Sequence, residues 1–94
     1  MTDLTLIIPA KKEKESLPKV LQSLEYLNYK IIVSLPKNDL ETINSVKNFN
    51  ILIHEQMGNG YGNSITEAIN KCSTKYFCIF NADGSFEYKD LKKI

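Results

Sequence analysis

Short apolar runs alternate with amphipathic segments along the chain. Four runs, at 4–8, 30–34, 50–54 and 76–80, are largely apolar, which is the pattern of buried parallel strands. The segments between them carry apolar residues at helical spacing: Leu17, Val20, Leu21, Leu24 and Leu27, then Leu40, Ile43 and Val46, then Ile65, Ala68 and Ile69. Residues 88–94 look like the start of another helix. The alternation predicts an α/β fold, a Rossmann-like parallel sheet of about four strands with helices on both faces.

Turn-forming and capping residues set the limits of these elements. Pro9 and Pro36 end the first two strands, and Ser16 with Pro18 opens the first helix. Asn38 or Asp39 can cap the second helix. We find no linker and no internal repeat, so the pattern predicts a single unit.

The composition is that of one globular domain, 1–94. Hydrophobic residues make up 43% of the chain and charged residues 24%, which is ordinary for a folded protein. The net charge is +1, and all 12 basic residues are Lys. The near-neutral charge and the absence of Arg, the usual bidentate ligand of phosphate and guanine, argue against a nucleic-acid partner.

Targeting signals and cysteines point to a cytoplasmic domain. Asp3 precedes a short apolar run that stops at Pro9, unlike a signal peptide, and no stretch approaches the ~20 apolar residues of a membrane span. Cys72 and Cys78 fit no common metal-binding spacing. We interpret them as structural or incidental thiols in a reducing compartment.

Polar and glycine-rich segments follow the predicted strands. They are Pro9–Glu13, Ser34–Asn38, His54–Gly62 and Asn81–Ser85. In open parallel sheets, ligands bind beyond the carboxyl ends of the strands, where the strand order reverses. The sequence therefore predicts a binding site at this edge of the sheet.

Asn81 and Asp83 directly follow the fourth strand. A carboxylate with an amide oxygen two residues earlier can hold a divalent cation, which would neutralise a diphosphate leaving group. Asn, Asp, Gly and Ser are also turn formers, so residues 81–85 equally fit a plain turn.

The loop with Gly58, Gly60 and Gly62 leads into the third helix. Such a loop lets backbone approach a ligand and a helix N-terminus favours anions, although a purely structural loop also fits. For His54, the only histidine, a capping or solvated role at the strand end is expected rather than catalysis. Glu13 and Glu15 either bind a ligand or complement the dipole of the first helix.

Three segments in order resemble family 2 glycosyltransferases. Residues 6–15 resemble that family's opening strand, which ends in a pattern like I-P-A-Y-N-E-E. Residues 58–64, with Ala68 and Ile69, resemble its glycine-rich loop and helix, and residues 76–86 resemble the strand that leads into the D-x-D metal motif. The nearest relatives by resemblance are the dolichol- and polyprenyl-phosphate sugar transferases.

The resemblance implies the N-terminal half of a GT-A fold, with strand order 3-2-1-4. It implies a nucleotide-binding set at the strand ends: Pro9, Ala10, Glu13, Ser34, Gly60, Asn81, Ala82 and Asp83. Asp83 and Asn81 would bind Mg²⁺ or Mn²⁺ on the diphosphate of a UDP- or GDP-linked sugar. The acceptor would be a polyprenyl phosphate or a saccharide, and the longer protein could work at the cytoplasmic membrane face.

The chain departs from the family pattern at four places. Lys11 and Lys12 replace an aromatic-Asn pair, and Ser34-Leu35-Pro36 replaces the D-D-G-S after the second strand, including the Asp expected to recognise the base. Asn81 replaces an acid, and Tyr88 stands where Pro is common. These departures put the base specificity and the metal affinity in question.

No catalytic residue can be assigned from this sequence. Family members run well beyond this length, so we expect a domain cut from a longer enzyme and inactive alone, with a sheet edge open to pairing with a second copy. The alternatives are a non-catalytic nucleotide-binding or regulatory module that keeps the fold, and a nucleotidyltransferase-like domain.

Overall fold

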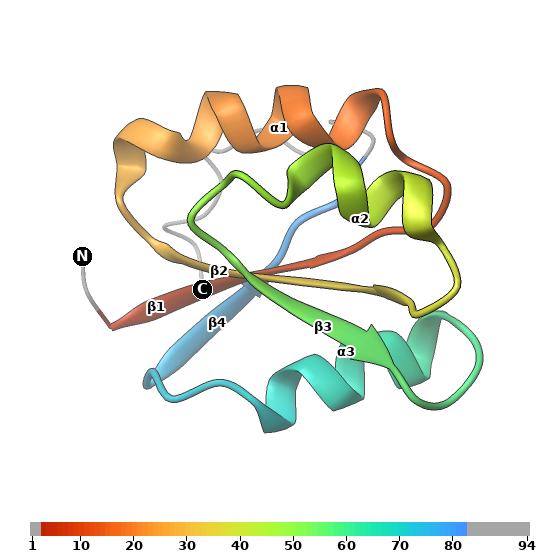
Figure 1. Cartoon of the computed structure of the whole chain (residues 1–94). Coiled ribbons are helices and arrows are strands. Elements are labelled where there is room, and N and C mark those ends of the chain that lie inside the picture. The colour runs from red at the N-terminus through yellow and green to blue at the C-terminus, as the bar shows by residue number, and fades with distance from the viewer. Residues whose placement is uncertain (1–2, 83–94) are drawn as a thin grey trace.

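The computed structural model describes residues 3–82, which form one sheet with helices on both sides (Figure 1). The elements in chain order are β1 (Leu4–Pro9), α1 (Ser16–Leu24), the 3₁₀ helix η1 (Glu25–Leu27), β2 (Lys30–Pro36), α2 (Leu40–Val46), β3 (Leu52–Gln56), α3 (Tyr61–Asn70) and β4 (Tyr76–Ile79). The four strands are parallel, in the order β3-β2-β1-β4. The predicted fold class and strand order are confirmed. The helix expected at 88–94 lies outside the described residues.

The helices form two unequal layers. Figure 1 shows α1 and α2 on one face of the sheet and α3 on the other. The larger core joins both of the first two helices to β1 and β2, with Leu6, Ile8, Leu17, Leu21 and Val33 almost completely buried. The smaller core, beneath α3, is built around Ile7, Ile32 and Ala68. Because alternate residues of a strand point to opposite faces, β1 supplies both cores.

The third strand lies two residues further along than the sequence predicts. It runs from Leu52 to Gln56, where the predicted run was 50–54. The strand is at an edge and pairs only with β2 among the described residues. Burial alternates only over its last three residues, where His54 and Gln56 are buried and Glu55 is exposed, whereas Leu52 at the start of the strand is exposed as well. A continuous apolar run was the wrong criterion for this strand.

The second helix buries the predicted face except at Leu40, and it also buries Thr42. Leu40 is 63% exposed, whereas Thr42 and Val46 are buried. Ile43 is partly buried against the larger core, as predicted. The hydroxyl of Thr42 accepts a hydrogen bond from the backbone of Glu13 at 3.1 Å, which explains a buried polar residue here.

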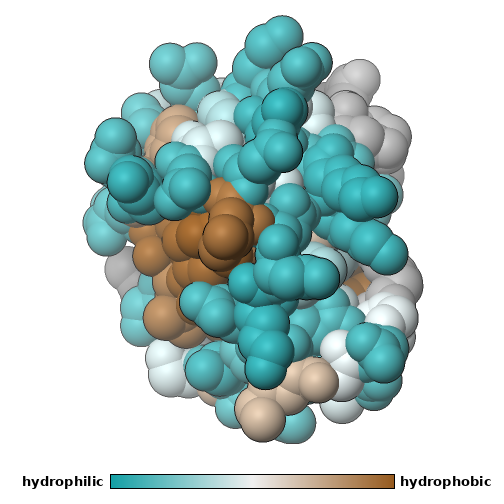
Figure 2. All heavy atoms as spheres, turned by 45° about the vertical axis from the view of Figure 1, so that its right-hand side comes forward, coloured by the Kyte–Doolittle hydropathy of each residue, from teal (hydrophilic) through white to brown (hydrophobic). Residues whose placement is uncertain are grey.

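Most of the face in Figure 2 is hydrophilic, with one compact apolar patch left of its centre. The most exposed large apolar side chains in the described region are Met57, Tyr26, Leu40, Leu52 and Tyr76. None of the described helices has the length and hydropathy that a membrane span requires. Cys72 and Cys78 are free thiols, and partial burial raises the pKa of each.

Candidate functional site

A cleft of about 940 Å³ opens at the carboxyl ends of the strands. Six of the eight predicted nucleotide-binding residues line it: Pro9, Ala10, Glu13, Gly60, Asn81 and Ala82. The sheet brings them together because β1 lies between β2 and β4. The N–H of Phe80 donates to the carbonyl of Ile7 at 2.8 Å, which continues the β4 pairing to the cleft. Asn81 and Ala82 therefore follow β4 into the cleft that Pro9 and Ala10 line.

The loop after β1 is held by the start of α2. Lys12 has φ 56°, in the left-handed region, and its N–H donates to Asp39 Oδ2 at 2.6 Å. Asp39 occupies the N-cap position of α2, and its carboxylate joins the start of that helix to the neighbouring loop. Burial alone would raise the pKa of Asp39, but hydrogen bonds from Lys12 and Thr42 outweigh it and lower that pKa.

Glu13 lines the cleft and also starts the first helix. Its carboxylate accepts a hydrogen bond from the Ser16 hydroxyl, and its carbonyl accepts the N–H of Leu17 at 2.9 Å. Glu15 is exposed at the N-cap position of α1, makes no side-chain capping bond and does not line the cleft. Of the two acids, Glu13 is therefore the one placed to contact a ligand.

Ser34 does not line the cleft. Its side chain is completely buried and donates to the carbonyl of Ser64 at 2.9 Å, while the Ser64 hydroxyl lies 2.8 Å from the Ser34 hydroxyl. The Ser34 carbonyl accepts the N–H of Ala10 at 2.8 Å. Ser34 thus joins β1, β2 and the first turn of α3 beneath the cleft, and its side chain has no open path to a nucleotide.

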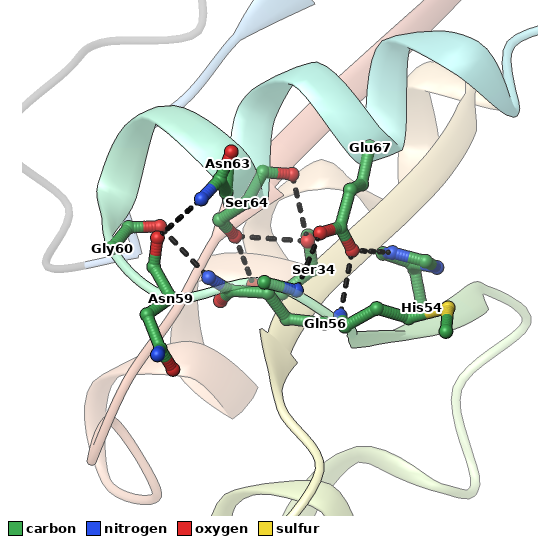
Figure 3. Close-up of polar contacts among 10 residues, drawn as sticks. Ser34, His54, Gln56, Asn59, Gly60, Asn63, Ser64 and Glu67 are labelled. Atoms are coloured by element: carbon green, nitrogen blue, oxygen red, sulfur yellow. Dashed lines mark hydrogen bonds and ion pairs between the residues drawn. The ribbon is translucent and has the colours of Figure 1, made fainter.

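The segment of residues 57–60, here called the glycine-rich loop, forms one wall of the cleft. Gln56 Nε2 donates to the carbonyl of Gly60 at 2.8 Å, and Asn63 Nδ2 donates to that of Asn59 at 2.6 Å (Figure 3). Gly60 has φ 89°, a conformation that side-chain-bearing residues rarely adopt. This glycine is needed for the turn into α3.

Glu67, on α3, binds the same loop from behind. Its Oε1 accepts hydrogen bonds from His54 Nε2 and from the N–H of Met57, each at 2.7 Å, and its Oε2 accepts the N–H of Gly58 at 2.7 Å. These bonds, with the Met57 N–H the strongest influence, lower the pKa of Glu67 from 4.5 to about 2. Glu67 is therefore ionised at neutral pH, and His54 Nε2 must carry the shared proton.

The expected role of His54 as a capping or solvated residue was wrong. The side chain is 7% exposed and its partner is Glu67, on a helix that begins after the loop. The misplaced end of β3 caused the error, because His54 lies inside the strand and points toward α3.

The described lining of the cleft carries more positive than negative charge. Lys11 and Lys37 line it, and Glu13 is the one acidic side chain among its described residues. The Glu13 carboxylate already accepts a hydrogen bond within its own helix start. Such a lining suits an anionic ligand.

The described residues do not by themselves make a metal site. Within residues 3–82, no three His, Cys, Asp or Glu side chains gather in a way that could hold an ion. Asn81 lines the cleft and offers an amide oxygen, a ligand type that Mg²⁺ accepts. Asp83, the predicted acidic ligand, lies outside the described residues, so the metal site stays a prediction.

Residues 5–94 match the sequence model of glycosyl transferase family 2, and the chain belongs to that family. Among solved structures, it is similar to mannosyl-3-phosphoglycerate synthase from Rubrobacter xylanophilus, with a TM-score of 0.81 and 12% sequence identity. The match covers 94% of this chain and 33% of that one, so the chain spans a third of the matched structure. A comparison with curated proteins finds none that matches.

Sequence reasoning missed the residues that hold the cleft walls in place. Asp39 was interpreted only as a helix cap, and Glu67 and Thr42 were not singled out. Glu67 lies one turn after Ser64 and beside Ala68, both buried on α3. An acid next to the buried face of a helix was the signal that could have identified it.

Proposed function

We propose that this chain binds the nucleotide-sugar donor of a glycosyl transfer reaction. The observation that carries the proposal is the cleft between the ends of β1 and β4 and the glycine-rich loop, in a chain of family 2. The strand order reverses beside β1, and open α/β sheets bind ligands at that point. Lys11 and Lys37 supply positive charge for a diphosphate.

The roles of the lining residues follow from their places in the cleft. Pro9, Ala10 and Glu13 would contact the nucleoside from the β1 side, and Gly60 would approach it from the opposite wall. Asn81, Ala82 and Asp83 would lie along the diphosphate. Asn81 and Asp83 would hold Mg²⁺ or Mn²⁺, which when bound would neutralise the charge of the departing nucleoside diphosphate.

We propose that the transfer itself takes place in a longer protein, which contains this chain and also carries the acceptor site. There, an oxygen of the acceptor would attack the anomeric carbon as the bond from that carbon to the diphosphate breaks. A polyprenyl phosphate or a saccharide would be the acceptor. In the described part of the chain, β4 is an edge strand with Tyr76 46% and Phe77 36% exposed, which supports the proposal of pairing between copies at this edge.

Calorimetric titration of UDP and GDP, with and without Mn²⁺, tests donor binding. We expect one of the two nucleotides to bind in a metal-dependent way, and Asp83→Ala to abolish that dependence because a carboxylate ligand is removed. The matched control is Glu25→Ala, which removes an exposed acid from η1 and should bind as the wild type does.

The outcomes separate the candidate functions. Metal-dependent binding that Asp83→Ala abolishes supports a donor site of the transferase type. Binding that is equally strong without Mn²⁺ supports a non-catalytic nucleotide module, a role that Asn81 in place of an acid favours. Failure of both nucleotides to bind the wild type under either condition contradicts the proposed function.

A further inference from the structure

Glu67 does not line the cleft, yet it accepts hydrogen bonds from backbone that does. The residues of the glycine-rich loop line one wall, together with Gln56. Two consecutive N–H groups of that wall, those of Met57 and Gly58, donate to the Glu67 carboxylate. Figure 3 shows the carboxylate on the helix side of the loop, between His54 and the loop backbone. Any effect of Glu67 on a ligand must therefore pass through the loop.

A side chain at Gly58 would crowd this contact. A Cβ placed there would lie 2.9 Å from Asn63 Nδ2 and 3.1 Å from Glu67 Oε2. The glycine thus leaves room for the Glu67 carboxylate to approach the backbone N–H. The group bound to that N–H is therefore a side chain of the protein and not a ligand. Those two N–H groups already hold an anion, so they are not available to a phosphate.

His54 completes the anchor from the strand side. Its ring is buried against α3, and it donates to the same Oε1 that accepts the Met57 N–H. Hydrogen bonds to an ionised acceptor are stronger than neutral ones, and here three of them meet at one carboxylate. The strand β3, the loop and the second turn of α3 are therefore joined at a single group.

We propose that Glu67 is a positioning residue for the candidate donor site, which holds Met57 and Gly58 so that the glycine-rich loop keeps one shape against the bound nucleotide. The inference rests on the proposed function for its ligand. It assigns the order of the loop to an internal carboxylate, which is present before any ligand binds. A preordered loop costs less entropy on binding.

The test compares Glu67→Gln with two controls in the full chain. Glutamine keeps the size of the side chain but places an amide donor against the donors it faces, so at least one contact is lost. Glu55→Gln removes an exposed acid from β3 and controls for charge. Val46→Ala lowers stability from the opposite core, which is remote from the loop, and controls for stability. Glu67→Asp keeps the charge with a shorter reach.

Two measurements are made on each variant: amide hydrogen exchange of Met57 and Gly58 by NMR without ligand, and titration of UDP and GDP with Mn²⁺. We expect Glu67→Gln to speed exchange of both amides and to weaken nucleotide binding, each by about tenfold, the ratio that corresponds to 1.4 kcal/mol. Glu67→Asp should fall between this variant and the wild type. Glu55→Gln and Val46→Ala should leave the affinity unchanged while they are folded.

Unchanged exchange at Met57 and Gly58 in Glu67→Gln would show that Glu67 does not hold the loop. Faster exchange with unchanged nucleotide affinity would show that holding the loop does not position it for the nucleotide. An equal loss of affinity in Val46→Ala overturns it too, because the effect would then be one of general stability. If Glu67→Gln does not fold, Glu67→Asp decides by the same two readouts. If the wild type binds neither nucleotide, the proposed function fails and the positioning role fails with it. The exchange result still decides whether Glu67 holds the loop.

Discussion

Individual backbone conformations in this chain depend on specific side-chain partners. Lys12 and Asn28 are the two non-glycine residues with positive φ in the described region, at 56° and 58°. Asn tolerates this conformation because its short polar side chain can bond locally, whereas a lysine pays a steric cost. The loop keeps Lys12 there because its N–H reaches Asp39. In the family pattern that residues 6–15 resemble, Asn stands at this place in the loop.

Lys12→Asn should therefore raise the stability of the fold. The expected gain in the free energy of unfolding is about 1 kcal/mol, since a non-glycine residue in the left-handed region costs roughly 1–2 kcal/mol and the cost is smaller for Asn. Urea unfolding measures it, with Lys11→Asn as the control because Lys11 is exposed and has no positive φ. A loss of stability in Lys12→Asn, or an equal gain in the control, would contradict this reading of the loop.

The ionisation of Glu67 gives a second prediction at this scale. Its pKa falls from 4.5 to about 2 on folding. Between these two values the unfolded chain binds a proton that the folded chain does not, so this group stabilises the fold above pH 4.5 and the contribution is lost as the pH falls toward 2. Glu67→Gln, which cannot titrate, should lose less stability over the same range.

Urea unfolding of both proteins through that pH range measures the difference. The gap in the free energy of unfolding between wild type and Glu67→Gln should be widest above pH 4.5 and should narrow toward pH 2. A gap that stays constant through the range would show that the Glu67 carboxylate is not protected from protonation in the folded protein.

The elements of the fold differ in how firmly they are packed. Helix α1 buries four apolar residues, Leu17, Val20, Leu21 and Leu24. Helix α3 buries Ala68 and Ser64, and its core partners on the sheet are Ile7 and Ile32. Apolar burial is the main stabilising contribution, so α3 is expected to be held more weakly. Its polar links, to Ser34 and to the glycine-rich loop, partly offset this.

Hydrogen exchange should accordingly be faster in α3 than in α1. Segments with fewer buried apolar contacts open locally at lower free energy than the global unfolding reaction requires. NMR or mass-spectrometric exchange on the free protein measures this, and a bound nucleotide should slow exchange in the first turn of α3 more than in α1. Uniform exchange across both helices would mean that α3 opens only with the whole molecule.

Sequence patterns predicted these elements unevenly for a physical reason. The strands β1 and β2 and the helix α1 are buried by their neighbours, so continuous or helically spaced apolar residues marked them correctly. The edge strand β3 was placed two residues too early because its last two residues, Glu55 and Gln56, are polar and were not counted as strand. The face of α2 was misjudged at Leu40 because Thr42 is buried by a hydrogen bond rather than by apolar packing.

At the scale of the whole molecule, the parallel topology explains why the site could be located before its details. The carboxyl ends of parallel strands meet at one edge, so four polar segments were expected together, and residues from all four line the cleft. What the pattern did not predict is which polar residues hold the walls. The Ser34 hydroxyl bonds to Ser64, on another element, and the Glu67 carboxylate bonds to the backbone of Gly58. Neither contact follows from the local pattern of polar and apolar residues.

The strand order also determines when the sheet can be completed. The first strand lies in the interior of the sheet, with Leu4 beside Tyr76, and the side chain of Asp3 bonds to the backbone of Lys75, 72 residues later. During synthesis the amino end leaves the ribosome first, so the edge of β1 that pairs with β4 stays unpaired until β4 has been synthesised. An apolar strand edge in that state can pair with a neighbouring nascent chain. The interval before β4 emerges is therefore when this protein is most exposed to misassembly.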